Sequence, residues 1–218
     1  SNLIIKFENA LNNPLISGIA IATRPDCLSP DILDLLEEIN QKHFMWVELG
    51  LQTIHKKTAD LINRCYALND FDHAMAELSN RKIKTVVHLI LGLPGESRSE
   101  MFESLDYVCG NVQNASTTSP SIPAWGIKLH LLNVVKGSQM EALYPDYVSF
   151  NSIEDYINLV TDMLEVIPPE ITIHRLTADA PRNILISPEW SYKKLTILNG
   201  INAELKKRGS FQGCKLLK

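Results

Sequence analysis

Residues 88–96 read His-Leu-Ile-Leu-Gly-Leu-Pro-Gly-Glu, an apolar run that ends in two glycines, a proline and a carboxylate. This pattern is typical of a buried parallel strand that ends at a ligand site, because glycine lets the backbone approach a ligand closely. A companion segment, residues 46–52, reads Trp-Val-Glu-Leu-Gly-Leu-Gln. The two segments predict an α/β sheet with one functional rim at the carboxyl ends of its strands.

The composition predicts one globular domain. The chain has 218 residues, of which 45% are hydrophobic and 21% are charged, and this is enough apolar material for a sizeable core. The net charge of -4 gives no general attraction to nucleic acid or anionic lipid. No apolar run approaches the roughly 18 to 20 residues of a membrane span, so we expect no membrane contact and a cytoplasmic location.

Hydrophobic periodicity predicts strands that alternate with helices along most of the chain. Such alternation favours parallel pairing through right-handed crossovers, as in a doubly wound sheet or a β/α barrel. The chain has no Gly-x-Gly-x-x-Gly or Walker motif, which favours a barrel, either complete or incomplete. The expected strands are 16–23, 45–50, 83–91, 126–132 and 171–175, and the expected helices are 3–11, one beginning at Pro30, 57–65, 71–81 (capped by Asn69 or Asp70), 99–112, 138–143, 153–167 and 189–208.

Three motifs carry a resemblance to radical S-adenosylmethionine enzymes. They are Thr-Arg-Pro-Asp at 23–26, Glu-Leu-Gly-Leu-Gln at 48–52 with Asn63 and Arg64, and Ile-Leu-Gly-Leu-Pro-Gly-Glu at 90–96. Their order resembles the branch of the elongator-type catalytic subunit and the oxygen-independent coproporphyrinogen oxidases. Three further segments, 174–177, 188–190 and 212–215, resemble an uncharacterised bacterial Fe-S oxidoreductase subfamily of that branch.

The resemblance implies a partial, TIM-like (β/α)6 barrel over residues 1–178, with a C-terminal helical extension and tail over 179–218. It implies that S-adenosylmethionine binds at the carboxyl ends of the strands, next to the segment that begins at Thr23. By position, Gln52 resembles a ribose contact and Arg64 resembles the residue that clamps the methionine carboxylate. Gly92 and Gly95 match the motif that packs the adenine.

The chain departs from the family pattern at two places. Many relatives carry Glu where this chain has Ala22, so Glu48 on the neighbouring strand is expected either to replace that ribose contact or to form an ion pair with a nearby base. Some relatives carry Asp where this chain has His88. A neutral imidazole can still hydrogen-bond a ribose hydroxyl, although a strand histidine is also often a satisfied core residue.

Four polar residues near the ends of later strands are candidate substrate-side groups: His130, Asn133, His174 and Arg175. A metal site built on the two histidines would need a third ligand, and none is suitably spaced. The four cysteines are scattered rather than paired, and we expect free thiols there.

The chain lacks the Cys-x3-Cys-x2-Cys motif that would hold a [4Fe-4S] cluster. We therefore expect the cluster ligands to lie outside this chain, in barrel strands that precede it. The full-length protein would cleave S-adenosylmethionine reductively to a 5′-deoxyadenosyl radical that acts on an unknown substrate, with flavodoxin or ferredoxin as the reductant. The truncated chain should be inactive, and the open edge of strand 16–23 should make it self-associate.

Two other functions remain open from the sequence. One is an ordinary β/α-barrel lyase or hydrolase that uses Glu48, His88 and Glu96 on the same rim. The other is a non-catalytic RNA-binding or protein-binding module. It would use the segment from Glu189 onward, where seven Lys or Arg accompany two Glu. RNA is also a possible substrate of the radical enzyme.

Overall fold

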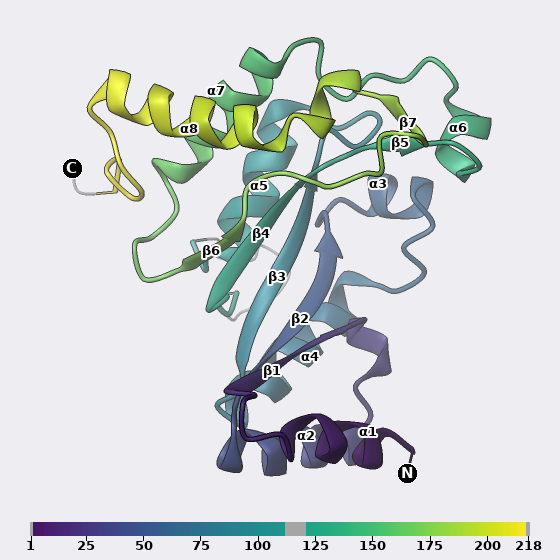
Figure 1. The fold of residues 1–218 in the computed structure, drawn as a ribbon, viewed down its shortest axis with the longest axis vertical. Coiled ribbons are helices and arrows are strands. Elements are labelled where there is room, and N and C mark those ends of the chain that lie inside the picture. Colours follow the sequence, from purple (N-terminus) through teal and green to yellow (C-terminus); the bar gives the residue numbers. More distant parts are fainter. Residues whose placement is uncertain (1, 112–120, 217–218) are drawn as a thin grey trace.

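A computed structural model of the chain describes residues 2–111 and 121–216. Five parallel strands form the main sheet, in the order β1-β2-β3-β4-β6 (Figure 1). The strands are β1 (Gly18–Thr23), β2 (Phe44–Gln52), β3 (Lys84–Leu91), β4 (Gly126–Leu131) and β6 (Thr172–Arg175). This confirms the predicted α/β class and a parallel sheet consistent with a partial TIM-like barrel.

The helices between the strands agree with the predicted order. They are α1 (Asn2–Leu11), α2 (Pro30–Lys42), α3 (Lys56–Leu61), α4 (Leu68–Asn80), α5 (Arg98–Val108), α6 (Gln139–Leu143) and α7 (Ile153–Leu164), with a 3-10 turn η1 (Pro25–Cys27) before α2. Residues 114–123, whose serine, threonine and proline content predicts a surface loop, lie mostly outside the described residues.

Three predictions about helices are wrong: the end of α3, the N-cap of α4 and the start of the final helix. Helix α3 stops at Leu61 instead of continuing to Cys65, because Asn63 and Cys65 adopt positive φ angles. The N-cap of α4 is Ala67; Asp70 lies in the first turn, where its carboxylate accepts a hydrogen bond from the Ala67 N–H at 2.8 Å.

The predicted final helix is in fact a 3-10 turn, η2 (Glu189–Tyr192), followed by α8 (Lys194–Arg208). A second sheet was not predicted: β5 (Val134–Val135) pairs antiparallel with β7 (Leu185–Ser187). These strands are too short for an alternating pattern to be read from the sequence.

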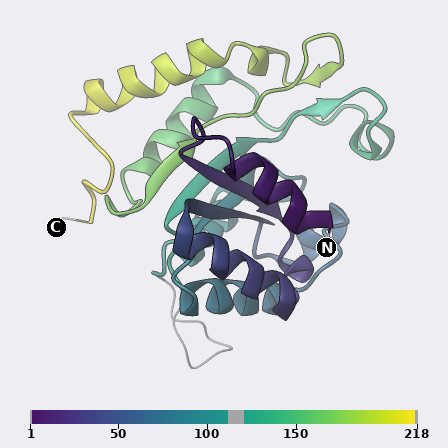
Figure 2. The same ribbon diagram turned by 60° about the horizontal axis from the view of Figure 1, so that its bottom comes forward.

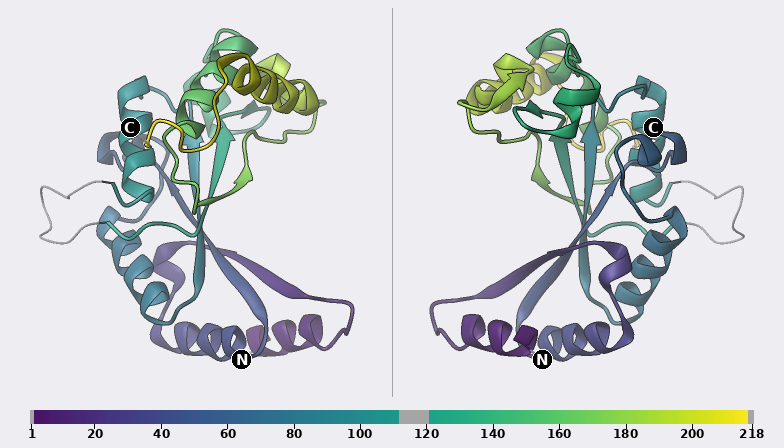
Figure 3. Two further views of the ribbon diagram at one scale, coloured as in Figure 1. Left: turned by 90° about the vertical axis from the view of Figure 1, so that its left-hand side faces the viewer. Right: turned by 90° about the vertical axis from the view of Figure 1, so that its right-hand side faces the viewer.

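The two faces of the main sheet differ in chemistry. On β2, β3 and β4 the odd-numbered side chains are almost fully buried and, apart from Thr85, apolar, for example Val47, Leu89 and Leu129. They pack on helices that lie along one side of the sheet, which Figure 3 shows for α4 and α5. The even-numbered side chains point to the opposite face, because successive side chains alternate across a strand. That open face carries the polar residues Glu48, His88, Lys128 and His130.

The C-terminal segment lies across the top of the molecule in Figure 1 and stands apart from α1 and α2 in Figure 2. Helix α8 packs on α7. The tail is held by Gln212, whose side chain donates to the carbonyls of Pro168 and Ile171 at 2.8 Å each. Lys215 pairs with the buried carboxylate of Glu165 at 2.5 Å. The division at residue 178 stays a prediction.

Among the described residues, no helix is long and apolar enough to cross a membrane.

Candidate functional site

A cavity of about 360 Å³ opens at the carboxyl ends of β2 and β3, and we call it the rim pocket. Its polar side consists of Arg24, Gln52, Asn63, Arg64 and Tyr66, with Gly50 and Gln139 nearby. Its apolar side consists of Leu61, Ile62, Ile90, Leu93, Leu132, Met140 and Leu143. A pocket that is apolar on one side and carries convergent polar groups on the other suits an amphipathic small molecule.

Gln52 is brought into the rim pocket by an irregular strand end. The pairing of β2 with β3 shifts register between Gly50 and Gln52, and Gln52 has a φ of 65°. Its side-chain oxygen lies 3.1 Å from the Tyr66 hydroxyl, which also contacts the Gly50 carbonyl. Burial raises the pKa of Tyr66 to about 12, so the phenol remains protonated at neutral pH. The Gln52 amide nitrogen has no such partner among the described residues and is free to donate to a ligand.

Arg64 is 8% exposed, and most of its hydrogen-bond donors are already used by the backbone. Nη1 donates to the carbonyls of Leu51 and Thr53 at 3.2 and 2.6 Å, and Nε and Nη2 donate to the Tyr66 carbonyl at 3.2 and 3.1 Å. A guanidinium has five N–H donors, so these four contacts leave one. The predicted carboxylate clamp stays a prediction, and in this arrangement it would use a single N–H instead of a two-pronged fork.

Three other predicted cofactor residues lie beside the rim pocket and do not form its lining. Thr23 ends β1, and its hydroxyl lies 3.4 Å from the Arg24 carbonyl. Gly92 has a φ of 81°, and its carbonyl accepts a hydrogen bond from the Tyr147 hydroxyl at 2.9 Å. Gly95 has a φ of 78° in open surroundings. Their ribose and adenine contacts stay predictions.

Directly below the rim pocket, the open face of the sheet carries four polar residues, Glu48, His88, Lys128 and His130, which we call the face cluster. Gly50 of the pocket is in register with His88, and Ile90 of the pocket is in register with His130. The pocket and the face cluster are therefore neighbouring parts of one surface.

Glu48 accepts hydrogen bonds from two other residues of the face cluster. It is 9% exposed, and its carboxylate accepts from Lys128 Nζ at 2.5 Å, His88 Nε2 at 3.0 Å and Trp46 Nε1 at 3.1 Å. Burial alone would raise the pKa of Glu48, but the hydrogen bonds from Lys128 and Trp46 and the Lys128 charge outweigh it and lower the pKa. The structure contains the ion pair that was one of the two roles left open for Glu48, and the ribose contact stays a prediction.

The two histidines of the face cluster lie side by side, with ring centroids 5.0 Å apart. Burial, followed by the nearby Lys128 charge, lowers the pKa of His88, so at neutral pH its Nε2–H donates to Glu48. Burial, His88 and the Arg175 charge lower the pKa of His130 to about 4. Within the part of the chain that the structure describes, His130 Nε2 and Asn133 Oδ1 are buried without a hydrogen-bond partner.

His174 lies at the other end of the open face, against Trp125 and Trp46 with ring centroids 5.3 and 5.7 Å away. The structure thus separates it from His130. Arg175 pairs in register with Lys128, and its closest acidic partner is Asp179 at 4.0 Å. Across residues 2–111 and 121–216, no group of three or more His, Cys, Asp or Glu is placed to hold a metal ion.

Two residues of the site were missed by the sequence analysis. Lys128 lies two positions before His130, so the two-residue period of a strand could have placed both on one face. Tyr66 follows Arg64 by two positions, but its contact with Gly50 depends on how the segment after α3 folds back, and no local pattern signals this.

The chain is similar in sequence to known proteins. The family model described as the Radical SAM superfamily matches residues 2–108, and the Radical_SAM C-terminal domain matches residues 124–207. The "Uncharacterized protein YtqA" of Bacillus subtilis is 43% identical over 95% of this chain and 62% of its own length. The tRNA uridine(34) acetyltransferase of Methanocaldococcus infernus is 21% identical over 78% of the chain and 30% of its own length.

Among solved structures, the archaeal Elp3 of Methanocaldococcus infernus with an N-terminal deletion aligns with a TM-score of 0.74. The alignment covers 90% of this chain and 43% of that protein, at 19% identity, and it shows a shared fold. The chain spans about three fifths of the length of YtqA, 62%.

Proposed function

Because the chain belongs to the radical S-adenosylmethionine superfamily, in its Elp3-like branch, we propose that it forms the cofactor rim and the open inner face of a radical S-adenosylmethionine oxidoreductase. The observation that carries this proposal is the rim pocket. One side of it is apolar and suits an adenine ring, and the other side offers amide and guanidinium donors for ribose and carboxylate oxygens. Its volume of about 360 Å³ lies within the usual range for small-molecule sites.

In this proposal Gln52 donates its free amide to a ribose oxygen, and Ile90 and Leu132 pack the adenine. Arg64 keeps the end of β2 and the segment after α3 together, and offers its remaining N–H to the methionine carboxylate. Bound S-adenosylmethionine would supply hydrogen-atom abstraction, through its reductive cleavage to a 5′-deoxyadenosyl radical. We propose that a [4Fe-4S] cluster held outside the described residues, and a flavodoxin or ferredoxin in the cytoplasm, supply the electron.

Isothermal titration of the chain with S-adenosylmethionine tests the pocket without requiring a cluster. We expect saturable binding that weakens about 10-fold in Gln52→Ala, because one hydrogen bond to a ligand is worth about 1 kcal/mol or somewhat more. The matched control is Gln212→Ala, which removes a glutamine far from the pocket. Binding that is absent, or equal in Gln52→Ala and the wild type, would argue against this pocket.

The reaction itself is tested with a longer protein that includes the region its relatives have beyond this chain. After anaerobic purification, about four irons per chain and formation of 5′-deoxyadenosine after dithionite treatment are expected. A protein that carries neither iron nor sulfide and forms no deoxyadenosine would exclude radical chemistry.

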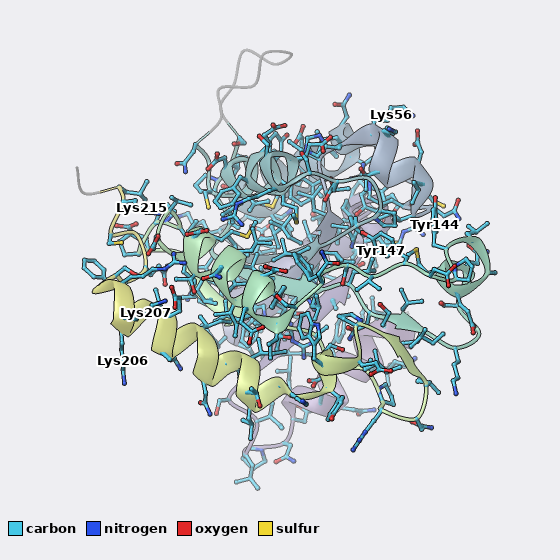
Figure 4. All side chains as sticks on the ribbon, turned by 90° about the horizontal axis from the view of Figure 1, so that it is seen from above. Lys56, Tyr144, Tyr147, Lys206, Lys207 and Lys215 are labelled. Carbon is cyan, nitrogen blue, oxygen red and sulfur yellow. The ribbon has the colours of Figure 1, made fainter. Side chains whose placement is uncertain are left out.

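RNA is a second candidate, as a substrate or a partner, because one relative is a tRNA uridine(34) acetyltransferase. Figure 4 shows Lys206, Lys207 and Lys215 together on the α8 side, away from Tyr144, Tyr147 and Lys56. Two of these lysines are already paired: Lys207 with Glu204 at 3.0 Å and Lys215 with Glu165 at 2.5 Å. The RNA proposal therefore predicts salt-sensitive tRNA binding that Lys206→Glu weakens, and binding unaffected by this change would count against it.

A further inference from the structure

The open face of the sheet has more hydrogen-bond donors than acceptors. Lys128 has three N–H donors, and Glu48 is its one recorded partner among the described residues. Arg175 has five donors, and the structure gives it a single acidic neighbour, Asp179, at 4.0 Å. His130 Nε2 is buried and has no partner in residues 2–111 and 121–216.

These side chains lie on two adjacent strands. Lys128 and His130 lie on the open face of β4, and Arg175 is the register partner of Lys128 on β6. The charge of Arg175 is one of the causes that lower the pKa of His88 and of His130. The side chains of Lys128 and Arg175 are 18% and 37% exposed, so both are partly withdrawn from water.

The charge balance of this region is positive. Lys128 and Arg175 are cations, and Glu48 is the carboxylate of the face cluster that pairs with Lys128. Asp179, near Arg175, is 56% exposed and is also bound by Lys194 at 2.6 Å. The two histidines are neutral at neutral pH. Water or a ligand can supply acceptors to the remaining donors of these partly exposed cations, and the excess of positive charge beside the rim pocket favours an anionic ligand.

We propose that Lys128 and Arg175 form a binding site for an anionic group of the substrate, a carboxylate or a phosphate, and that His130 lies beside it. The anion lies on the open face below the rim pocket and accepts hydrogen bonds from Lys128 and Arg175. Glu48 and His88 are positioning residues: Glu48 holds Lys128 and fixes the His88 ring, against which His130 packs. The inference rests on the proposed function, because it identifies the substrate class of the same enzyme.

The proposed anion site would also orient the substrate toward the cofactor. Gly50 and Ile90 of the rim pocket are register neighbours of His88 and His130, so an anchored acid group would hold the rest of a small substrate next to the bound cofactor. Holding two reactants in a fixed relation is itself a large part of catalysis. An uncharged substrate would leave the same donors without acceptors.

The test is an NMR titration of the chain with sodium phosphate and, separately, sodium acetate, at constant ionic strength adjusted with chloride. The imidazole C–H signals of His88 and His130 report binding, and His88→Gln and His130→Gln assign them. We expect saturable shifts of the His130 signal with one of the two anions. Tighter binding of phosphate identifies a phosphorylated substrate, and tighter binding of acetate identifies a carboxylic acid.

Lys128→Gln and Arg175→Gln should each weaken binding at least 5-fold, while Lys6→Gln, which changes an exposed lysine of α1, should leave it unchanged. Circular dichroism verifies that each variant is folded, and Arg175→Gln changes a side chain exposed enough to be replaced without loss of the core. The absence of saturable shifts with either anion, or equal binding in the folded Arg175→Gln variant and the wild type, would overturn the proposal.

This experiment contains no S-adenosylmethionine, so it can fail independently of the proposed function. Binding of the cofactor without binding of either anion would exclude the proposed substrate class but not the proposed radical enzyme. Binding of an anion without binding of the cofactor would support the anion site and exclude the rim pocket as the cofactor site.

Discussion

At the residue scale, Arg64 shows how a motif residue can have a structural task in addition to the one that its motif implies. Its guanidinium connects the end of β2 to the segment after α3 through the carbonyls of Leu51, Thr53 and Tyr66. These connections give the polar side of the rim pocket its shape. The effect of losing Arg64 would therefore extend beyond any direct contact with a ligand.

We expect Arg64→Met to lower the free energy of unfolding by about 3 kcal/mol, because buried carbonyls lose charged donors. The control is Arg98→Met, which removes an arginine whose side chain is 52% exposed, and whose surface ion pair is worth about 1 kcal/mol at most. Urea denaturation measures both. Equal stabilities of Arg64→Met and the wild type would mean that Arg64 does not hold this part of the fold together.

His130 makes stability depend on pH. Its pKa is about 4 in the folded protein and near the ordinary 6.5 in the unfolded chain, so below pH 6.5 the unfolded state binds a proton that the folded state does not. The folded state should therefore lose stability as the pH falls from 6.5 to 4, by on the order of 2 kcal/mol. His88, whose pKa is also lowered, acts in the same direction.

The measurement is urea denaturation at several pH values for the wild type, His130→Gln and the control His43→Gln, which changes an exposed histidine. His130→Gln should reduce the loss of stability between pH 6.5 and 4, and His43→Gln should leave this loss as in the wild type. A wild-type stability that stays constant between pH 6.5 and 4 would contradict the lowered pKa.

At the element scale, the loop after β3 has two glycines with similar backbone angles in different surroundings. A Cβ on Gly92 would lie 2.7 Å from both the Ser149 side chain and the Phe150 ring, whereas a Cβ on Gly95 would meet nothing within 4 Å. Gly92 is thus required by its φ and by packing, and Gly95 by its φ alone. The end of β3 is fixed by the segment that precedes α7.

Gly95→Ala should cost about 1 kcal/mol of stability, from the left-handed backbone alone. Gly92→Ala should cost at least about 2 kcal/mol, because the added methyl also displaces Ser149 or Phe150. Thermal unfolding of the two variants side by side measures the difference. Equal losses of stability in the two variants would show that residues 149–150 move aside without a cost in free energy.

At the scale of the whole molecule, β1 is an edge strand with one neighbour, β2, in the described sheet. The exposed Ala20 and Ala22 lie along it. An unpaired edge of this kind can pair with another copy of the chain. The predicted self-association stays a prediction, and the sheet order gives it a definite location.

Sedimentation velocity over a range of concentrations should show reversible association of the wild type. Ala20→Lys should reduce it, since a charge on an edge strand opposes pairing. Ser79→Lys adds the same charge on an exposed turn of α4 and should have no effect. A wild type that is monomeric at every concentration would exclude pairing through β1.

The amino-acid sequence alone predicts the order of the main strands and helices, the parallel sheet, and the rim at which Gln52 ends β2 and Gly92 follows β3. These features depend on local periodicity and on short motifs. It also suggested His130 and Arg175 without placing them together. The two-residue period carried enough information to add Lys128 to the same face.

The contacts that these side chains make follow from the tertiary structure. Glu48 became the partner of Lys128 and His88 because β2, β3 and β4 are adjacent in this register, and Arg64 turned to the backbone because α3 ends at Leu61. The division of the histidines, with His130 beside His88 and His174 beside Trp125, has the same origin. Contacts between residues distant in the chain depend on register and on the places where helices stop, which local sequence patterns do not specify.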